Sequence, residues 1–203
     1  AAGPGLVGSL TAGICAAKAL ASSLGKPLYG VNHVIGHLAV DKLADGPLPE
    51  HFIGLVVSGG HSNILEIRNI ATDVVELGGT LDDAAGEAFD KVGRLLDLPY
   101  PGGPHVDRLS QQGDREAIRF PRGLAAGKDK ERHKYDFSFS GLKTAVARYI
   151  EGARARGETV SKENVCAAFS EAVNDSLTAK AVRAALDTGC DTIVVGGGFS
   201  ANS

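Results

Sequence analysis

The chain has 203 residues, of which 43% are hydrophobic and 22% charged, and its formal net charge at pH 7 is -3. This composition is ordinary for a folded globular protein, and the length allows one sizeable core or two small subdomains that share a cleft. The negative balance argues against non-specific binding of nucleic acid, so any RNA contact must use a local patch. The sequence has neither an apolar run near the ~20 residues of a membrane span nor a signal peptide. We therefore expect a cytoplasmic protein without membrane contact.

The cysteines and the two chain ends give further expectations. Cys15, Cys166 and Cys190 are widely spaced, and Cys15 and Cys166 lie in apolar helical patterns, which favours buried free thiols over disulfides or metal ligands. The sequence lacks methionine, even at position 1, and stops at Ser203 just after a glycine-rich turn. Both features indicate an internal fragment of a longer protein.

The first 50 residues are expected to hold two helices and one short strand. Apolar residues at helical spacing predict a helix over 6–24, and residues 26–31 predict a strand that leads into a helix over 33–43. A cluster of Pro, Gly and Asp over 45–50 is typical of a linker. We therefore divide the chain into residues 1–50 and 51–203.

The second part reads as an α/β unit. Strand, turn, strand, third strand and then helix is the opening of a ribonuclease-H-like unit, and a long helix followed by a buried strand comes later. Residues 105–150 are expected to be mostly helical with a charged, irregular middle. The other expected elements are strands at 52–57, 63–67, 73–78 and 192–195 and helices at 83–96 and 162–188, the last ending at Gly189.

His33 and His37 are spaced at i and i+4, which places both imidazoles on one face of a helix, one turn apart. Two histidines at this spacing can bind one metal ion, although such pairs are also often only packed or solvated. Asp41 lies roughly 12 Å along the helix axis from His33 and cannot easily share that metal. His61 and His105, in loops, remain candidate ligands.

Two glycine-rich turns follow hydrophobic strands. In residues 58–62, consecutive glycines let the backbone bend and direct N–H groups at an anion, and Ser58 and Ser62 would add hydroxyl donors. A plain hairpin turn explains this segment equally well. Residues 196–202 contain three glycines and lead towards a helix, whose free N–H groups favour a phosphate or a polar edge of adenosine. Together the two turns favour a nucleotide cleft.

Each carboxylate near these turns has either a structural role or a contact with a ligand. Asp82 lies in the capping zone of the helix at 83–96, and we interpret it as a cap. The small residues 84–86 suggest a face that something else approaches closely, so Asp90 is either solvated or accepts hydrogen bonds from a ribose. Asp107 follows a loop at 100–104 and is either a helix N-terminal carboxylate or a substrate contact.

A basic segment runs from Arg115 to Lys134, with seven Lys or Arg against three Asp or Glu. A solvated loop is the simpler interpretation. The alternative is a phosphate-binding patch for RNA.

These features together resemble the tRNA threonylcarbamoyladenosine transferase family, formerly described as O-sialoglycoprotein endopeptidases. The resemblance implies an α/β protein with the actin/Hsp70-like ATPase (ASKHA) fold and two ribonuclease-H-like subdomains. Residues 1–50 would be the end of the first subdomain and 51–203 most of the second, so both would be incomplete in this chain. The matching segments span nearly the whole chain in order, at 3–10, 31–39, 57–62, 81–92, 100–104, 138–144 and 196–202.

The resemblance also implies an activity, namely transfer of threonylcarbamoyl from threonylcarbamoyl-AMP to N6 of adenosine 37 in tRNAs that read codons beginning with A. By resemblance, His33 and His37 bind one divalent metal ion, Fe²⁺ or Zn²⁺, which holds the threonylcarbamoyl group. A third ligand, an aspartate, is expected beyond Ser203, so we expect this fragment alone to be inactive. The implied substrate contacts are Val56, Val57, Ser58, Gly59 and Gly60 for the carbamoyl and phosphate groups, Asp90, Gly103 and Asp107 for the ribose side, and Asn202 for adenosine.

The family acts in bacteria with a paralogous actin-fold partner subunit and a P-loop ATPase subunit. The alternatives are a catalytically silent scaffold subunit of the same complex, an actin-fold small-molecule kinase and a metalloprotease. The silent paralogue lacks the histidine pair, and the kinases do not need it. Val34 stands where an H-E-x-x-H protease has its glutamate base. Ser62 replaces the usual threonine of the family and keeps the hydroxyl.

Overall fold

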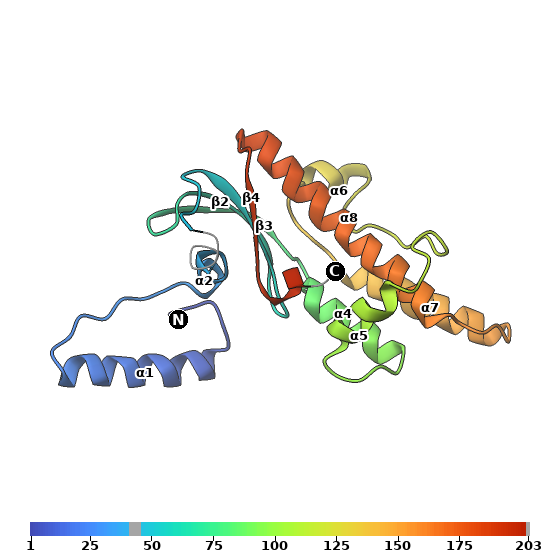
Figure 1. Cartoon of the computed structure of the whole chain (residues 1–203), viewed down its shortest axis with the longest axis horizontal. Coiled ribbons are helices and arrows are strands. Elements are labelled where there is room, and N and C mark those ends of the chain that lie inside the picture. Colours follow the sequence, from blue (N-terminus) through green and yellow to red (C-terminus); the bar gives the residue numbers. More distant parts are fainter. Residues whose placement is uncertain (41–45, 202–203) are drawn as a thin grey trace. The chain divides into compact units, whose positions relative to one another are not determined.

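The computed structural model describes residues 1–40 and 46–201, and internal contacts divide the chain into two units, Ala1–Leu48 and Pro49–Ser203 (Figure 1). The first unit contains α1 (Val7–Ser23) and α2 (His33–Ala39), which confirms two helices at the expected places. Asn32 caps α2, because its Oδ1 accepts hydrogen bonds from the N–H groups of Val34 (2.8 Å) and Ile35 (3.2 Å). The assignment of this unit to an actin-like subdomain stays a prediction.

The strand predicted over residues 26–31 is absent from the described part of the first unit. A strand forms only where another chain segment takes its N–H and C=O groups. Here that pairing is a single parallel bridge between Gly3 and Asn32. Two backbone hydrogen bonds flank it, from Ala2 N–H to the Val31 carbonyl (2.8 Å) and from His33 N–H to the Gly3 carbonyl (2.7 Å). The β-prone residues of this segment therefore remain in an irregular connection.

The second unit is built on a four-stranded mixed sheet in the order β3-β2-β1-β4. β1 (Phe52–Val57) pairs antiparallel with β2 (Ser62–Asn69) and parallel with β4 (Ile193–Gly196), and β2 pairs antiparallel with β3 (Asp73–Gly79). β1 is central and buried along its whole length, which explains its continuous apolar run. This order confirms the α/β class and the ribonuclease-H-like succession of elements.

Helices inserted between β3 and β4 make the rest of the unit (Figure 1). The longest, α8 (Lys162–Thr188), has the predicted bounds and contacts β1, β2 and β4. It begins at the Ser161 cap and ends at Gly189, whose φ of 71° is left-handed. The others are α4 (Ala85–Leu95), α5 (Gly102–Ser110), α6 (Gly127–Arg132) and α7 (Ser140–Ala155). The 3₁₀ turn η1 (Gly198–Ala201) follows β4.

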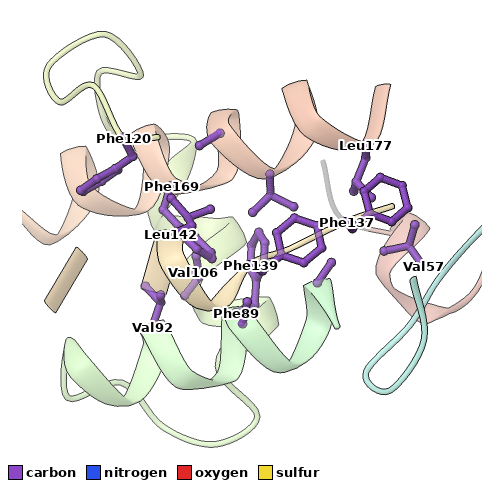
Figure 2. Packing of buried hydrophobic residues seen from close by; sticks show 14 of the residues in the cluster. Val57, Phe89, Val92, Val106, Phe120, Phe137, Phe139, Leu142, Phe169 and Leu177 are labelled. Atoms are coloured by element: carbon purple, nitrogen blue, oxygen red, sulfur yellow. The ribbon is translucent and has the colours of Figure 1, made fainter. Parts of the chain in front are cut away.

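The core lies between the helices and one face of the sheet (Figure 2). Phe89 of α4 packs edge-to-face on Phe169 of α8 and on Phe199 of η1, with ring centroids 4.8 and 4.7 Å apart. Val57, at the end of β1, belongs to the same cluster. The aromatic contacts therefore join the middle of α4 to α8 and to the turn after β4.

The cysteine predictions are confirmed for one residue and wrong for another. Cys166 is buried, and burial raises the pKa of its thiol to about 12. Cys15 on α1 is exposed, because no described element covers the apolar residues of that helix. None of the described helices is both long and apolar enough to cross a membrane.

We expected Asp82 to cap the helix that follows it, and this prediction is wrong. Asp82 caps the start of α7 instead. Its carboxylate accepts hydrogen bonds from the hydroxyls of Ser138 (2.6 Å) and Ser140 (2.7 Å) and from the N–H groups of Phe139 (2.8 Å) and Ser140 (3.2 Å). α4 instead begins after Ala84, which makes no side-chain cap. A carboxylate can cap the N-terminus of α4 or of α7. The sequence near Asp82 shows only α4, because α7 begins far along the chain.

We expect Asp82→Ala to destabilise the protein by roughly 1 to 2 kcal/mol at pH 7, the cost of losing a helix cap. Burial favours the neutral acid, but the hydrogen bonds from Ser138, Phe139 and Ser140 outweigh it and hold the pKa of Asp82 below its usual value. A carboxylate whose pKa is lower in the folded state than in the unfolded state stabilises the folded protein at pH values above the unfolded pKa. This contribution is lost as the pH falls through the folded-state pKa. Denaturant unfolding from pH 7 to pH 2 should therefore show the difference between wild type and variant shrinking below about pH 4. A difference that does not depend on pH would contradict this role.

Candidate nucleotide and metal sites

The two glycine turns lie against each other because β1 and β4 are parallel neighbours. Val56 of β1 pairs with Gly196 of β4, so both strands end at the same edge of the sheet. Gly197 has a φ of 106°, and a Cβ there would overlap the backbone carbonyl of Val57. The two turns are thus in direct contact, and Gly197 is required by this contact.

The first turn also packs against α4. The N–H of Gly86 donates to the Ser58 carbonyl (3.3 Å), and a Cβ on Gly86 would lie 2.7 Å from that oxygen. The small face expected at residues 84–86 is therefore approached by the chain itself. By contrast, a Cβ on Gly59 or Gly60 would meet no atom of residues 1–40 and 46–201 within 4 Å. These two glycines border open space.

The serine hydroxyls of this turn have internal roles. Ser62 is fully buried, and its Oγ accepts a hydrogen bond from the N–H of Ala85 (2.9 Å). Ser62 therefore holds the start of α4. We expected its hydroxyl to face an anion, and this prediction is wrong. Ser58 Oγ accepts from the N–H of His61 (3.1 Å) and tightens the turn. Val56 and Val57 are buried, with exposed fractions of 0% and 2%. Val57 also lines the cavity beside the turns.

Asp90 links α4 to α5. Its Oδ1 accepts hydrogen bonds from the N–H groups of Gly102 (2.7 Å) and Gly103 (3.4 Å), at the positive end of α5. A Cβ on Gly93 would lie 2.9 Å from the Cα of Gly102, so the two helices are in close contact here. Asp90 thus positions α5, while its ribose contact stays a prediction. Gly103 borders open space.

A cavity of about 270 Å³ lies beside the joined turns. Asp107 of α5 lines it, together with polar residues of α8 that sequence reasoning missed. These α8 residues are polar and lie at positions i, i+4 and i+8 of a largely buried helix. In the sequence alone, this spacing is also typical of a helix face that contacts solvent. Asn202 lies outside the described residues. The lining residues are Leu55, Val57, Phe89, Asp107, Ser170, Asn174, Leu177, Thr178, Val195, Phe199 and Ser200.

The histidine pair lies on α2 in the first unit. The imidazole centroids of His33 and His37 are 4.7 Å apart with 66° between their planes, and both rings line a cavity of about 310 Å³. Two nitrogen ligands one helical turn apart match the chemistry of an Fe²⁺ or Zn²⁺ site. Within residues 1–40 and 46–201, no three His, Cys, Asp or Glu side chains are placed together for a metal. Asp41 lies outside the described residues.

The basic segment is bound to α8 by ion pairs. Arg115 pairs with Glu171, Arg122 with Asp175 and Lys134 with Asp187, the last with an N–O distance of 3.2 Å. The three acids lie on one helix. These pairs favour a structural role for the segment. Its use as an RNA patch stays a prediction.

The chain is similar to several known proteins. Curated tRNA N6-adenosine threonylcarbamoyltransferases from Corynebacterium diphtheriae and Bifidobacterium adolescentis are 57% and 53% identical over 99% and 100% of this chain. The chain spans 57% and 58% of the length of these two relatives. Component A of the Acidaminococcus fermentans (R)-2-hydroxyglutaryl-CoA dehydratase superposes on 85% of this chain, and the chain covers 55% of that structure, with a TM-score of 0.49 and 13% identity. The family model described as TsaD, tRNA N6-adenosine threonylcarbamoyltransferase, matches residues 1–203, and the chain belongs to that family.

Proposed function

We propose that the full-length protein transfers the threonylcarbamoyl group of threonylcarbamoyl-AMP to N6 of adenosine 37 in tRNAs that read codons beginning with A. The observation that carries this proposal is the match of the family model over residues 1–203. The adjacent glycine turns and the neighbouring cavity support it, because they form a site of the size and polarity of a nucleoside.

In the proposed complex the acyl-adenylate lies along the joined turns. The open backbone at Gly59 and Gly60 faces the carbamoyl and phosphate groups, where a side chain would obstruct close approach. Asp107 accepts hydrogen bonds from the ribose hydroxyls, and Asp90 holds α5 so that Gly103 and Asp107 keep their places. Asn202 contacts adenosine. The amine of the tRNA base attacks the carbamoyl carbon, the bond from this carbon to the phosphate oxygen breaks, AMP leaves, and the amine gives up one proton to solvent.

His33 and His37 are the proposed metal ligands, joined by an aspartate beyond Ser203. Their spacing on α2 and the nitrogen donor set fit one Fe²⁺ or Zn²⁺ ion. A bound metal would supply Lewis-acid polarisation of the carbamoyl carbonyl. The Asn32 cap fixes the start of α2, the helix that carries both histidines.

The proposed partners are the tRNA, a paralogous actin-fold subunit and a P-loop ATPase subunit of the bacterial modification complex, in the cytoplasm. The histidine pair favours the catalytic subunit over a silent scaffold, which would not need it. It also disfavours a small-molecule kinase of the same fold.

The test is a modification assay with the full-length protein, its partner subunits, synthetic threonylcarbamoyl-AMP and an unmodified tRNA whose anticodon reads an A-starting codon. We expect N6-threonylcarbamoyladenosine in the nucleoside digest, detected by mass spectrometry, and AMP in equal amount. A matched tRNA with guanosine at position 37 should remain unmodified. Failure to form the product with the partners and the metal present would overturn the proposal.

We expect Gly60→Ala to weaken binding of threonylcarbamoyl-AMP at least about tenfold while leaving the unfolding midpoint within about 1 °C. A Cβ at Gly60 would meet no atom within 4 Å in the described part of the chain, so it would obstruct a ligand that lies against this turn. Calorimetric titration and thermal unfolding of the full-length protein measure both quantities. Unchanged affinity would exclude close approach of the substrate at this glycine.

A further inference from the structure

A second cavity lies between the basic segment and the C-terminal half of α8, where α6 runs beside that helix (Figure 1). Its volume is about 500 Å³, and the residues that line it lie within 122–134 and 175–186. We call it the α6–α8 groove. Among the described residues, none lines both this groove and the cavity beside the glycine turns, so the nucleotide site does not account for it.

Apolar side chains line the α6–α8 groove and stay partly open to solvent. Val182 and Leu186 lie one turn apart on α8, with exposed fractions of 43% and 75%. Leu124 and Ala125 line the groove from the basic segment. Exposed apolar side chains that are grouped together and bordered by charged ones are typical of an interaction site.

The wall opposite α8 has an uncommon backbone conformation. Leu124 has a φ of 55°, in the left-handed region that residues with a side chain rarely adopt. A Cβ on the preceding residue, Gly123, would overlap the carbonyl of Ser138, so the chain is closely packed here. Strained backbone persists where the surrounding structure fixes it, and it is common at binding sites. This wall is therefore pre-formed.

Five cationic side chains line the same groove. They form ion pairs with three carboxylates, Asp175, Asp187 and Glu131, so five positive charges meet three negative ones. The whole chain has a net charge of -3, which makes this excess of cations a local feature. A local excess of positive charge attracts a negatively charged partner. The five cations are Arg122, Lys130, Lys134, Lys180 and Arg183.

Lys180 is the most buried of these cations, with an exposed fraction of 8%. Within the described ranges its Nζ has one hydrogen-bond partner, the carbonyl of His133 (2.8 Å). Burial lowers the pKa of the Lys180 ammonium, although the negative charge of Asp136 acts in the opposite direction. An ammonium can donate three hydrogen bonds, so a carboxylate brought into the groove would stabilise this one.

We propose that the α6–α8 groove binds an acidic amphipathic helix of a partner protein. The apolar face of such a helix contacts Leu124, Val182 and Leu186, and its carboxylates approach the surrounding cations. RNA phosphates would also be attracted by the cations, but they stay hydrated and gain nothing from exposed valine and leucine side chains. The mixture of apolar and cationic groups therefore favours a protein helix. This inference does not depend on the proposed function.

The probe is a fluorescein-labelled peptide of about 16 residues, with leucines on one helical face and glutamates elsewhere. We expect the full-length protein to bind it with a Kd of about 10 μM at low salt, measured by fluorescence anisotropy. Lys130→Glu should weaken binding about tenfold, and Leu186→Ser about fivefold. Both positions are exposed, so the unfolding midpoint should stay within about 2 °C.

Arg148→Glu is the matched control, because it makes the same change of charge at an exposed position of α7 outside the groove. This variant should bind the peptide with wild-type affinity. A peptide with lysine in place of each glutamate should bind at least about tenfold more weakly than the acidic one. Equal binding of the two peptides would overturn the proposal, because the cations would then have no part in recognition.

Two further outcomes would also overturn it. One is a full-length protein that does not bind the acidic peptide, or binds it equally well with and without the groove substitutions. The other is a labelled anticodon stem-loop RNA that binds where the peptide does not and loses affinity in Lys130→Glu. That result would assign the groove to RNA.

Discussion

Replacing both His33 and His37 with alanine is expected to remove the bound metal from the full-length protein and to lower the rate of tRNA modification at least about 1,000-fold. Loss of even one outer-shell partner of a metal ligand typically costs 10- to 100-fold in affinity or activity, and here two direct ligands are removed. Alanine is the best helix former, so α2 should persist with its Asn32 cap intact. Metal content by mass spectrometry and the modification rate measure the effect.

The matched control is His133→Gln, because the His133 ring is hydrogen-bonded to Asp136 (2.9 Å) and has no proposed metal role. This variant should retain wild-type metal content. Each single variant, His33→Ala or His37→Ala, should lose most of the metal. A double variant that keeps both the metal and the modification activity would exclude the histidine pair as the metal site.

The sequence predicted best the elements whose signals are local. The bounds of α8 follow from the Ser161 cap, the helical periodicity and Gly189, all within the helix or adjacent to it. Residues 26–31 have the β-prone composition of a strand, but whether a strand forms depends on a partner elsewhere in the chain. The strand prediction therefore failed where the helix prediction succeeded.

The candidate site shows the same limit. The glycine turns were predicted from composition, but a glycine does not reveal whether a ligand or the chain itself needs the missing side chain. Gly86 and Gly197 are needed by the chain, whereas Gly59 and Gly60 border open space. Ser170 was missed because a polar residue on a helix usually faces water, and only the packing around α8 buries its hydroxyl.

Gly197→Ala is expected to have the largest effect of any single substitution in the glycine turns, since it combines two penalties. Its φ of 106° strains any side-chain-bearing residue, and the added Cβ overlaps the Val57 carbonyl, which belongs to the central strand.

We expect a loss of about 3 kcal/mol in unfolding free energy, which lowers the unfolding midpoint by roughly 6 to 12 °C for a unit of this size. Displacing the turn should also weaken AMP binding about 100-fold, because the ends of β1 and β4 no longer meet. Gly198→Ala is at an adjacent position, where no described residue has an atom within 4 Å of the new Cβ, and it should leave the midpoint unchanged. Equal midpoints for the two variants would show that the turns do not depend on their mutual contact.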